Sequence, residues 1–208
     1  MLLRKHKVIR PSLDHLVAND RYFKKAFKPA DIDLIEHRHR PCSFESFART
    51  IVGQQLSTKA AATIWGRVAL LADPFTPELV MKLADTDLRG AGLSGQKVTY
   101  LRGLCEALSA GTFNPAKLKK LDDEGVIEAI TALKGFGRWS AEMVLMFALT
   151  RPDVFSGGDL GLREGMKRVL KLPERPTEKE SVKLAERWAG HRTAASLLLW
   201  HAIKMDPL

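Results

Sequence analysis

A short turn with two glycines interrupts the helical pattern of the chain at Gly135-Phe136-Gly137. Apolar residues on both sides of it recur with helical spacing, so the turn is expected to join two helices in a tight reversal. Glycine permits the left-handed backbone that such a reversal needs. The next helix is predicted to begin at about Arg138, where unpaired N–H groups and the positive dipole end suit a phosphate oxygen. The segment is therefore either a contact for a DNA backbone or an ordinary helix corner that needs glycine.

Helical periodicity continues over almost all of the 208 residues, and no stretch alternates between apolar and polar residues as a strand does. Capping signals divide the pattern into about ten predicted helices, with Thr76-Pro77 and the capping box Thr177–Glu180 among the clearest. The connections are mostly short, as helix packing favours. We therefore expect an all-α protein with two interleaved lobes and a waist after Gly111 or within residues 112–121.

Composition restricts where the protein is expected to be located and which cofactors and partners it is expected to have. No run of 18 apolar residues exists, and the N-terminal residues lack the apolar region of a signal peptide, so we expect a cytoplasmic protein without a membrane span. Cys42 and Cys105 are too few for a disulfide framework or a four-thiolate cluster. His37 and His39 are expected in a solvated basic loop, and no metal site is predicted. The net charge of +9 favours a polyanionic partner, although basic enzymes without nucleic-acid partners are common.

Three motifs in order give the chain a resemblance to a known family. The string LKGFGRWSA at residues 133–141 resembles the hairpin of the helix-hairpin-helix glycosylase superfamily, Leu-Pro-Gly-hydrophobic-Gly-x-x-Thr/Ser-Ala, with Lys134 in place of the usual proline. The turn GQQLS at residues 53–57 looks like the Gly-Gln-x-x-Ser turn of that family. The turn GLSGQK at residues 92–97 is similar to one in the DNA-3-methyladenine glycosylase II branch. The resemblance covers about residues 40–204, without the N-terminal β-rich domain of the larger relatives.

The resemblance carries an expected organisation and function. It implies one glycosylase domain over residues 1–208, with the hairpin motif at about 123–150 and a catalytic loop and helix at 153–170. It implies a monomeric enzyme that removes alkylated bases of the 3-methyladenine type from double-stranded DNA in base-excision repair. No cofactor is required, and a structural monovalent cation held by the hairpin carbonyls fits the family.

Asp159 follows the hairpin and a loop, where the resemblance places one catalytic aspartate. Breaking an N-glycosidic bond leaves positive charge on the sugar, which a carboxylate beside C1′ can stabilise while it orients the attacking water. An alkylated purine already carries positive charge, so one carboxylate can suffice. The alternative role is an N-cap of the next helix, and Asp159 can do both. Relatives that also cut the backbone use a lysine where this chain has Trp139, so we expect a monofunctional hydrolase without lyase activity.

A glycosylase must flip its target base, stack it in a pocket and fill the gap in the duplex. The resemblance implies four residues for the base pocket: Trp139, Trp200, Met143 in place of a tyrosine, and Phe44. Each could instead pack in the core, as we expect for Trp65 and Trp188. Gln55 falls at the wedge position, and a surface glutamine at a helix end is its alternative. Candidate contacts to the DNA backbone, any of which could be merely solvated, are Lys97, Lys134, Gly135, Gly137, Arg138, Ser140, Arg163 and Lys167.

Other functions stay open at this point. A non-enzymatic DNA-binding module could use the hairpin only as a grip on the duplex. A related glycosylase for oxidised or mismatched bases is disfavoured because the chain lacks the hairpin lysine and a four-cysteine cluster. A purely structural helical protein leaves the order of hairpin, aspartate and glutamine turn unexplained. Which alkylated or deaminated base is preferred does not follow from the residues.

Overall fold

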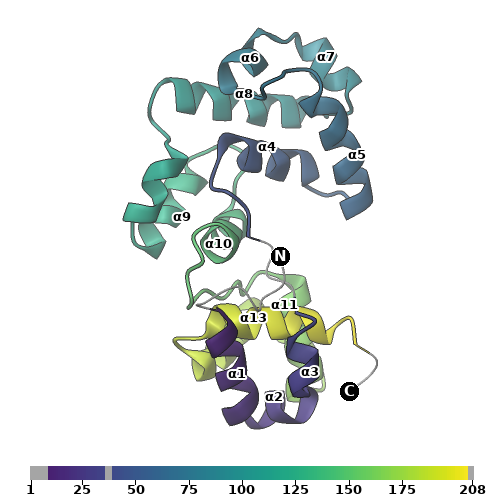
Figure 1. The fold of residues 1–208 in the computed structure, drawn as a ribbon, viewed down its shortest axis with the longest axis vertical. Coiled ribbons are helices and arrows are strands. Elements are labelled where there is room, and N and C mark those ends of the chain that lie inside the picture. Colours follow the sequence, from purple (N-terminus) through teal and green to yellow (C-terminus); the bar gives the residue numbers. More distant parts are fainter. Residues whose placement is uncertain (1–8, 36–38, 206–208) are drawn as a thin grey trace. The chain divides into compact units, whose positions relative to one another are not determined.

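The computed structural model describes residues 9–35 and 39–205 of the chain. Within these ranges every regular element is a helix, which confirms the predicted all-α class (Figure 1). The described residues form thirteen α-helices, more than the ten or so expected, because helices of only four to six residues offer too few positions for a periodic pattern. None of these helices is long and apolar enough to cross a membrane. The N-terminal residues and His37, about which the sequence made predictions, lie outside the described residues.

The chain divides into two compact units, one made of residues 1–39 with 142–208 and the other of residues 40–141. The predicted interleaving is confirmed, because the first unit combines both ends of the chain. The predicted waist at 112–121 is wrong, because that segment belongs inside the second unit. Phe113 there packs edge-on against Phe47 with ring centroids 5.1 Å apart, and Leu118 is buried. Whether residues 1–208 act as a single domain stays a prediction.

Helix α13 (Arg192–Ala202) forms the centre of the first unit, which we call the terminal unit. Every residue from Thr193 to Leu199 is buried, as the apolar run of this segment predicts. The helix packs on α1 and α11, and close approach to α11 requires Gly165, because a Cβ there would overlap the Leu199 backbone. The other elements of this unit are α1 (Ile9–Asn19), α2 (Arg21–Ala26), α3 (Pro29–Ile32), α11 (Leu160–Leu170), α12 (Glu178–Ala185) and η3 (Glu186–Trp188).

The second unit, which we call the hairpin unit, is built around α4 (Phe44–Gly53), which packs on α5 and α8. Phe47, Ile51 and Val52 bury one face of α4, at the spacing expected for an amphipathic helix. The remaining elements of this unit are α5 (Thr58–Ala69), α6 (Pro77–Lys82), α7 (Asp85–Gly90), α8 (Gly95–Ser109), η2 (Pro115–Lys120), α9 (Asp123–Thr131) and the first turn of α10 (Arg138–Phe147). Helices of this unit are capped by side chains that accept a backbone N–H of the first turn, among them those of Ser57, Thr76, Ser94 and Asp122, and the predicted cap at Thr76 is thereby confirmed.

The contact at Gly165 gives a stability test with a matched control. We expect Gly165→Ala to lower the free energy of unfolding by about 2 kcal/mol or more, because the added methyl group meets backbone that cannot turn aside. Gly103→Ala lies in the interior of α8, where the added Cβ would meet no atom within 4 Å apart from nearby backbone of its own helix, and it should raise the free energy of unfolding by about 0.5–1 kcal/mol. Urea denaturation measures both changes. Equal effects of the two substitutions would contradict this packing.

Candidate functional site

Asp159 caps α11, so the capping role considered from the sequence is confirmed. Its Oδ1 accepts the Leu162 N–H at 2.8 Å. The same oxygen accepts the indole Nε1–H of Trp200 from α13 at 3.0 Å. The two donors come from different helices and fix the orientation of a carboxylate that is partly exposed.

Trp200 lies beside Asp159 rather than deep in the core, and its side chain is only partly buried. Its ring stacks on Phe147 with centroids 5.9 Å apart and an interplanar angle of 27°. A Cβ at Gly161 would lie 3.2 Å from the indole, so glycine at that position leaves room for the ring. The structure therefore brings together Asp159 and one of the predicted pocket tryptophans.

The loop of residues 151–159, which we call the Asp159 loop, is also held at its beginning by α13. Asp153 accepts two bonds from the Arg192 guanidinium, at 2.7 and 2.8 Å, and a third from the Arg192 N–H at 3.2 Å. Thr193 Oγ1 accepts the Val154 N–H at 3.1 Å. Burial alone would raise the pKa of Asp153, but these bonds outweigh it and hold the pKa below its usual value. The loop is thus attached to one buried helix at both ends.

The predicted hairpin is present in the hairpin unit, between α9 and α10. Gly135 has φ +93°, and a Cβ there would overlap the Tyr100 ring, so conformation and space both require glycine. Phe136 is buried and packs edge-on against Phe47 at 5.6 Å, so it anchors the hairpin in the core of this unit. Gly137 is exposed, and its carbonyl accepts the first bond of α10 at 3.2 Å. The reversal therefore presents exposed backbone at the start of a helix.

The turn at residues 53–57 is joined to this hairpin. Gln54 Nε2 donates to the Gly135 carbonyl at 2.7 Å. Gln55 follows with φ +58°, a left-handed conformation that is uncommon for a residue other than glycine, and its side chain is exposed. The predicted wedge residue thus lies at the exposed tip of a fixed turn. Gln54 was not among the predicted site residues, although the Gly-Gln-x-x-Ser motif contains it.

Lys97 has a structural role that the sequence did not indicate. Its Nζ donates to the carbonyls of Val52 and Gln54, at 2.8 and 2.9 Å, where α4 ends. Burial lowers the pKa of this ammonium group. Lys97 therefore supports the turn that carries Gln55, and its predicted contact with phosphate stays a prediction.

The remaining predicted backbone contacts differ in exposure. Lys134 and Arg138 are exposed, and Arg138 pairs with Glu124 at 3.0 Å on the surface of the hairpin unit. Ser140 is buried. Arg163 lies in the terminal unit and donates to a carbonyl of the turn before α12 at 3.5 Å. Exposure and position make Lys134 and Arg138 the more suitable of these side chains for a phosphate group.

The other predicted pocket residues differ in how far they are buried and in what they pack against. Phe44 stacks on Phe75 at 5.3 Å, within an aromatic cluster of the hairpin unit that includes Trp65. Trp139, in the same unit, is 48% exposed, which is unusual for so large an apolar side chain. Met143 is partly buried in the terminal unit. Trp65 and Trp188 are buried, which confirms the prediction that they belong to the core.

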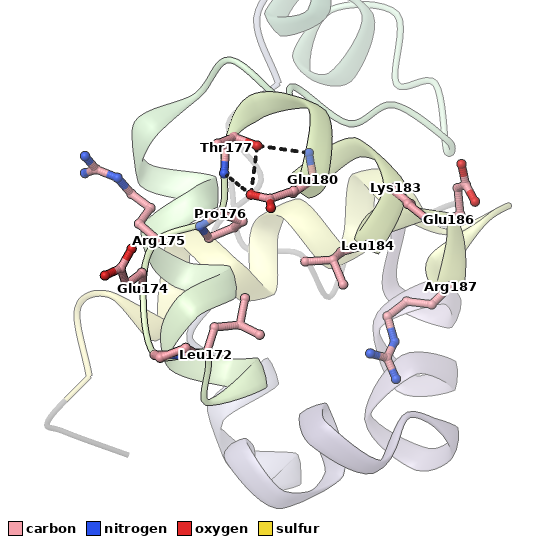
Figure 2. Close-up of a pocket in the computed structure, with 11 residues that line it drawn as sticks. Leu172, Glu174, Arg175, Pro176, Thr177, Glu180, Lys183, Leu184, Glu186 and Arg187 are labelled. Atoms are coloured by element: carbon pink, nitrogen blue, oxygen red, sulfur yellow. Dashed lines mark hydrogen bonds between the residues drawn. The ribbon is translucent and has the colours of Figure 1, made fainter.

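A separate hollow of ≈ 930 Å³ lies in the terminal unit beside α12 (Figure 2). Its lining does not include Asp159 or Trp200, so it is distinct from the predicted base pocket. The capping box between Thr177 and Glu180 forms part of its wall. Three acidic and three basic side chains balance each other around it, an arrangement that does not favour a nucleic acid: Glu174, Glu180, Glu186, Arg175, Lys183 and Arg187. No group of three or more potential metal ligands occurs among the residues that the structure describes.

Residues 48–190 match the family model of HhH-GPD superfamily base excision DNA repair proteins. The chain belongs to this superfamily. DNA-3-methyladenine glycosylase 1 of Schizosaccharomyces pombe is 35% identical over 167 residues, which are 78% of this chain and 73% of that protein. DNA-3-methyladenine glycosylase 2 of Escherichia coli is 28% identical over 177 residues, which are 79% of this chain and 59% of that protein.

Solved structures agree with the family in fold. The S. pombe 3-methyladenine DNA glycosylase Mag1 in complex with abasic DNA superimposes with a TM-score of 0.81 at 30% identity, over 95% of this chain and 98% of that one. A DNA-3-methyladenine glycosidase from Bacillus halodurans gives a TM-score of 0.78 at 36% identity, over 91% and 88% of the two chains. The predicted helix-hairpin-helix glycosylase fold is thereby confirmed.

The positive φ of Gln55 leads us to predict that glycine at this position would make the protein more stable. We expect Gln55→Gly to raise the free energy of unfolding by about 0.5–1 kcal/mol, because glycine adopts a positive φ without steric cost. Gln55→Ala removes the same polar group but keeps Cβ, so it should bring no such gain. Thermal denaturation of the three proteins distinguishes these cases. A gain of the same size in both variants would show that φ is not the cause.

Proposed function

We propose that the protein is a DNA glycosylase that hydrolyses the N-glycosidic bond of alkylated bases, of the 3-methyladenine type, in double-stranded DNA during base-excision repair. The observation that supports this most is the held carboxylate of Asp159, which two helices orient through Leu162 and Trp200. It follows the hairpin in the chain, as the resemblance implies, and lies within the residues that match the family model. The names of the relatives indicate the same substrate class.

Asp159 can act on the sugar without a second acid. The alkylated base is a cation, so it takes the electron pair of the breaking bond and departs as a neutral molecule with no added proton. The sugar gains positive charge, which the adjacent carboxylate stabilises. Water then adds at C1′ and loses its proton to the carboxylate or to solvent. Because Trp139 occupies the position of the lyase lysine, the reaction should stop at an abasic site.

We propose that the hairpin unit both binds the DNA backbone and fills the gap left by the flipped base. The exposed start of α10, with Lys134 and Arg138 beside it, suits a phosphate of the duplex. Gln55, at the tip of the turn, is proposed to fill the gap that a flipped base leaves. We expect Gln55→Ala to slow release of a base paired in a duplex more than release of the same base opposite an abasic site, where no base pair must be broken and no orphaned base is left. An equal effect on both substrates would exclude the wedge role.

The test of the proposed chemistry is base release from methylated duplex DNA under single-turnover conditions. We expect Asp159→Asn to lower the rate constant by about 10²-fold or more, because the amide cannot stabilise positive charge as a carboxylate does. Asp14→Asn replaces an exposed carboxylate on α1 of the same unit and should leave the rate unchanged. Strand scission should appear only after alkali treatment.

Other outcomes would support different functions. Scission without alkali would show that Trp139 does not prevent lyase chemistry. DNA binding without base release by the unmodified protein would favour the non-enzymatic DNA-binding module. Release of oxidised or mismatched bases, with alkylated bases retained, would move the protein to another branch of the superfamily.

A further inference from the structure

A buried carboxylate, that of Glu142, is bonded to a buried hydroxyl three residues before Asp159, and the proposed chemistry uses neither group. Glu142 of α10 is only 7% exposed, although glutamate is rarely buried without a partner. Its Oε2 accepts the hydroxyl of Ser156, which is fully buried. Removing a carboxylate from water is costly unless it is hydrogen-bonded, so this pair specifies one arrangement of the Asp159 loop.

The bonded serine leads directly to the carboxylate. The Ser156 carbonyl accepts the Asp159 N–H at 3.1 Å and closes the turn on which Asp159 lies. Glu142 therefore holds the residue at one end of this turn, and Asp159 stands at the other. A shift of Ser156 would be transmitted to the Asp159 backbone through that single hydrogen bond and three peptide units.

The same turn also contacts α12. The Ser181 hydroxyl donates to the Glu178 carbonyl at 2.7 Å and lies 3.3 Å from the Gly157 carbonyl. A Cβ at Gly157 would lie 2.6 Å from Val182 and 3.2 Å from the Glu178 carbonyl, so the turn packs closely on this helix. Contacts with both α12 and Glu142 therefore restrict the position of the turn.

We infer that Glu142 is a positioning residue, which acts through Ser156 to set the place of the Asp159 carboxylate. This inference rests on the proposed function, in which Asp159 stabilises charge on the sugar. Such stabilisation depends steeply on distance, and a misplacement of about 1 Å can cost about 10²-fold in rate. A pair with a merely structural role would affect folding stability without acting through Asp159.

A double-mutant cycle separates these two roles. Single-turnover release of 7-methylguanine from saturating methylated duplex is measured for the full-length chain, Ser156→Ala, Asp159→Asn and the double variant. We expect Ser156→Ala to lower the rate constant about 10-fold or more while the affinity for the duplex stays within about twofold. In the Asp159→Asn background the same substitution should change the residual rate less than about twofold, because there is no catalytic carboxylate left to misplace.

Two further comparisons guard against loss of folding. Ser196→Ala removes another fully buried hydroxyl of the terminal unit. Among the described residues, that hydroxyl bonds to the Arg192 carbonyl of its own helix, so its loss should leave the rate of base release unchanged. Glu142→Gln keeps an acceptor for Ser156 and should stay closer to the unmodified rate than Glu142→Ala. Melting temperatures of all variants show that each is folded under the assay conditions.

Different results would contradict the positioning role of Glu142 and the proposed role of Asp159. The positioning role would be overturned if Ser156→Ala released the base as fast as the unmodified protein. It would also be overturned if Ser156→Ala lowered the rate by the same factor with and without Asp159→Asn. Either result would leave Asp159 as the catalyst. An unmodified rate in Asp159→Asn would overturn the proposed role of Asp159, and the positioning role with it.

Discussion

The attachment of the Asp159 loop to the buried helix α13 is the interaction on which the candidate site depends. Asp153 is bonded to Arg192 where the helix begins, and Asp159 is bonded to Trp200 near its end. Since α13 is buried along nearly all its length, it provides a rigid base for a loop that itself has no regular structure. Close packing at Gly165 brings α11, which Asp159 caps, against the same helix. One helix thus sets both the path of the loop and the orientation of its carboxylate.

The exposed turns of the hairpin unit are also held in place, but by a different kind of contact. Its two exposed turns are held by side chains that bond to backbone carbonyl groups. Lys97 bonds to the last carbonyls of α4, and Gln54 bonds to Gly135 in the hairpin. These bonds satisfy acceptors that helix ends and turns leave open, so the exposed backbone keeps one conformation. A strained residue such as Gln55 can persist only where its neighbours are fixed in this manner.

Local features of the fold could be predicted from the sequence, and contacts between distant residues could not. Helical spacing, caps such as Thr76 and the glycines of the hairpin act within a few residues, so the all-α class and the Gly135 reversal followed from them. The bond from Lys97 to Val52 and the stacking of Phe44 on Phe75 join separate helices, and no periodic pattern encodes them. Glu142 did leave a signal, an acidic residue within an apolar stretch of helix, but only the structure supplies Ser156 as its partner.

The most direct test of this account is the single-turnover rate of base release by Trp200→Phe. Phenylalanine keeps an aromatic ring to stack on Phe147 but removes the N–H that bonds to Asp159. If attachment to α13 sets the catalytic carboxylate, the rate should fall by about tenfold or more, the scale expected for a misplaced catalytic group, with little change in affinity for the duplex. An unmodified rate would show that the hydrogen bond from α13 does not position the group that does the chemistry.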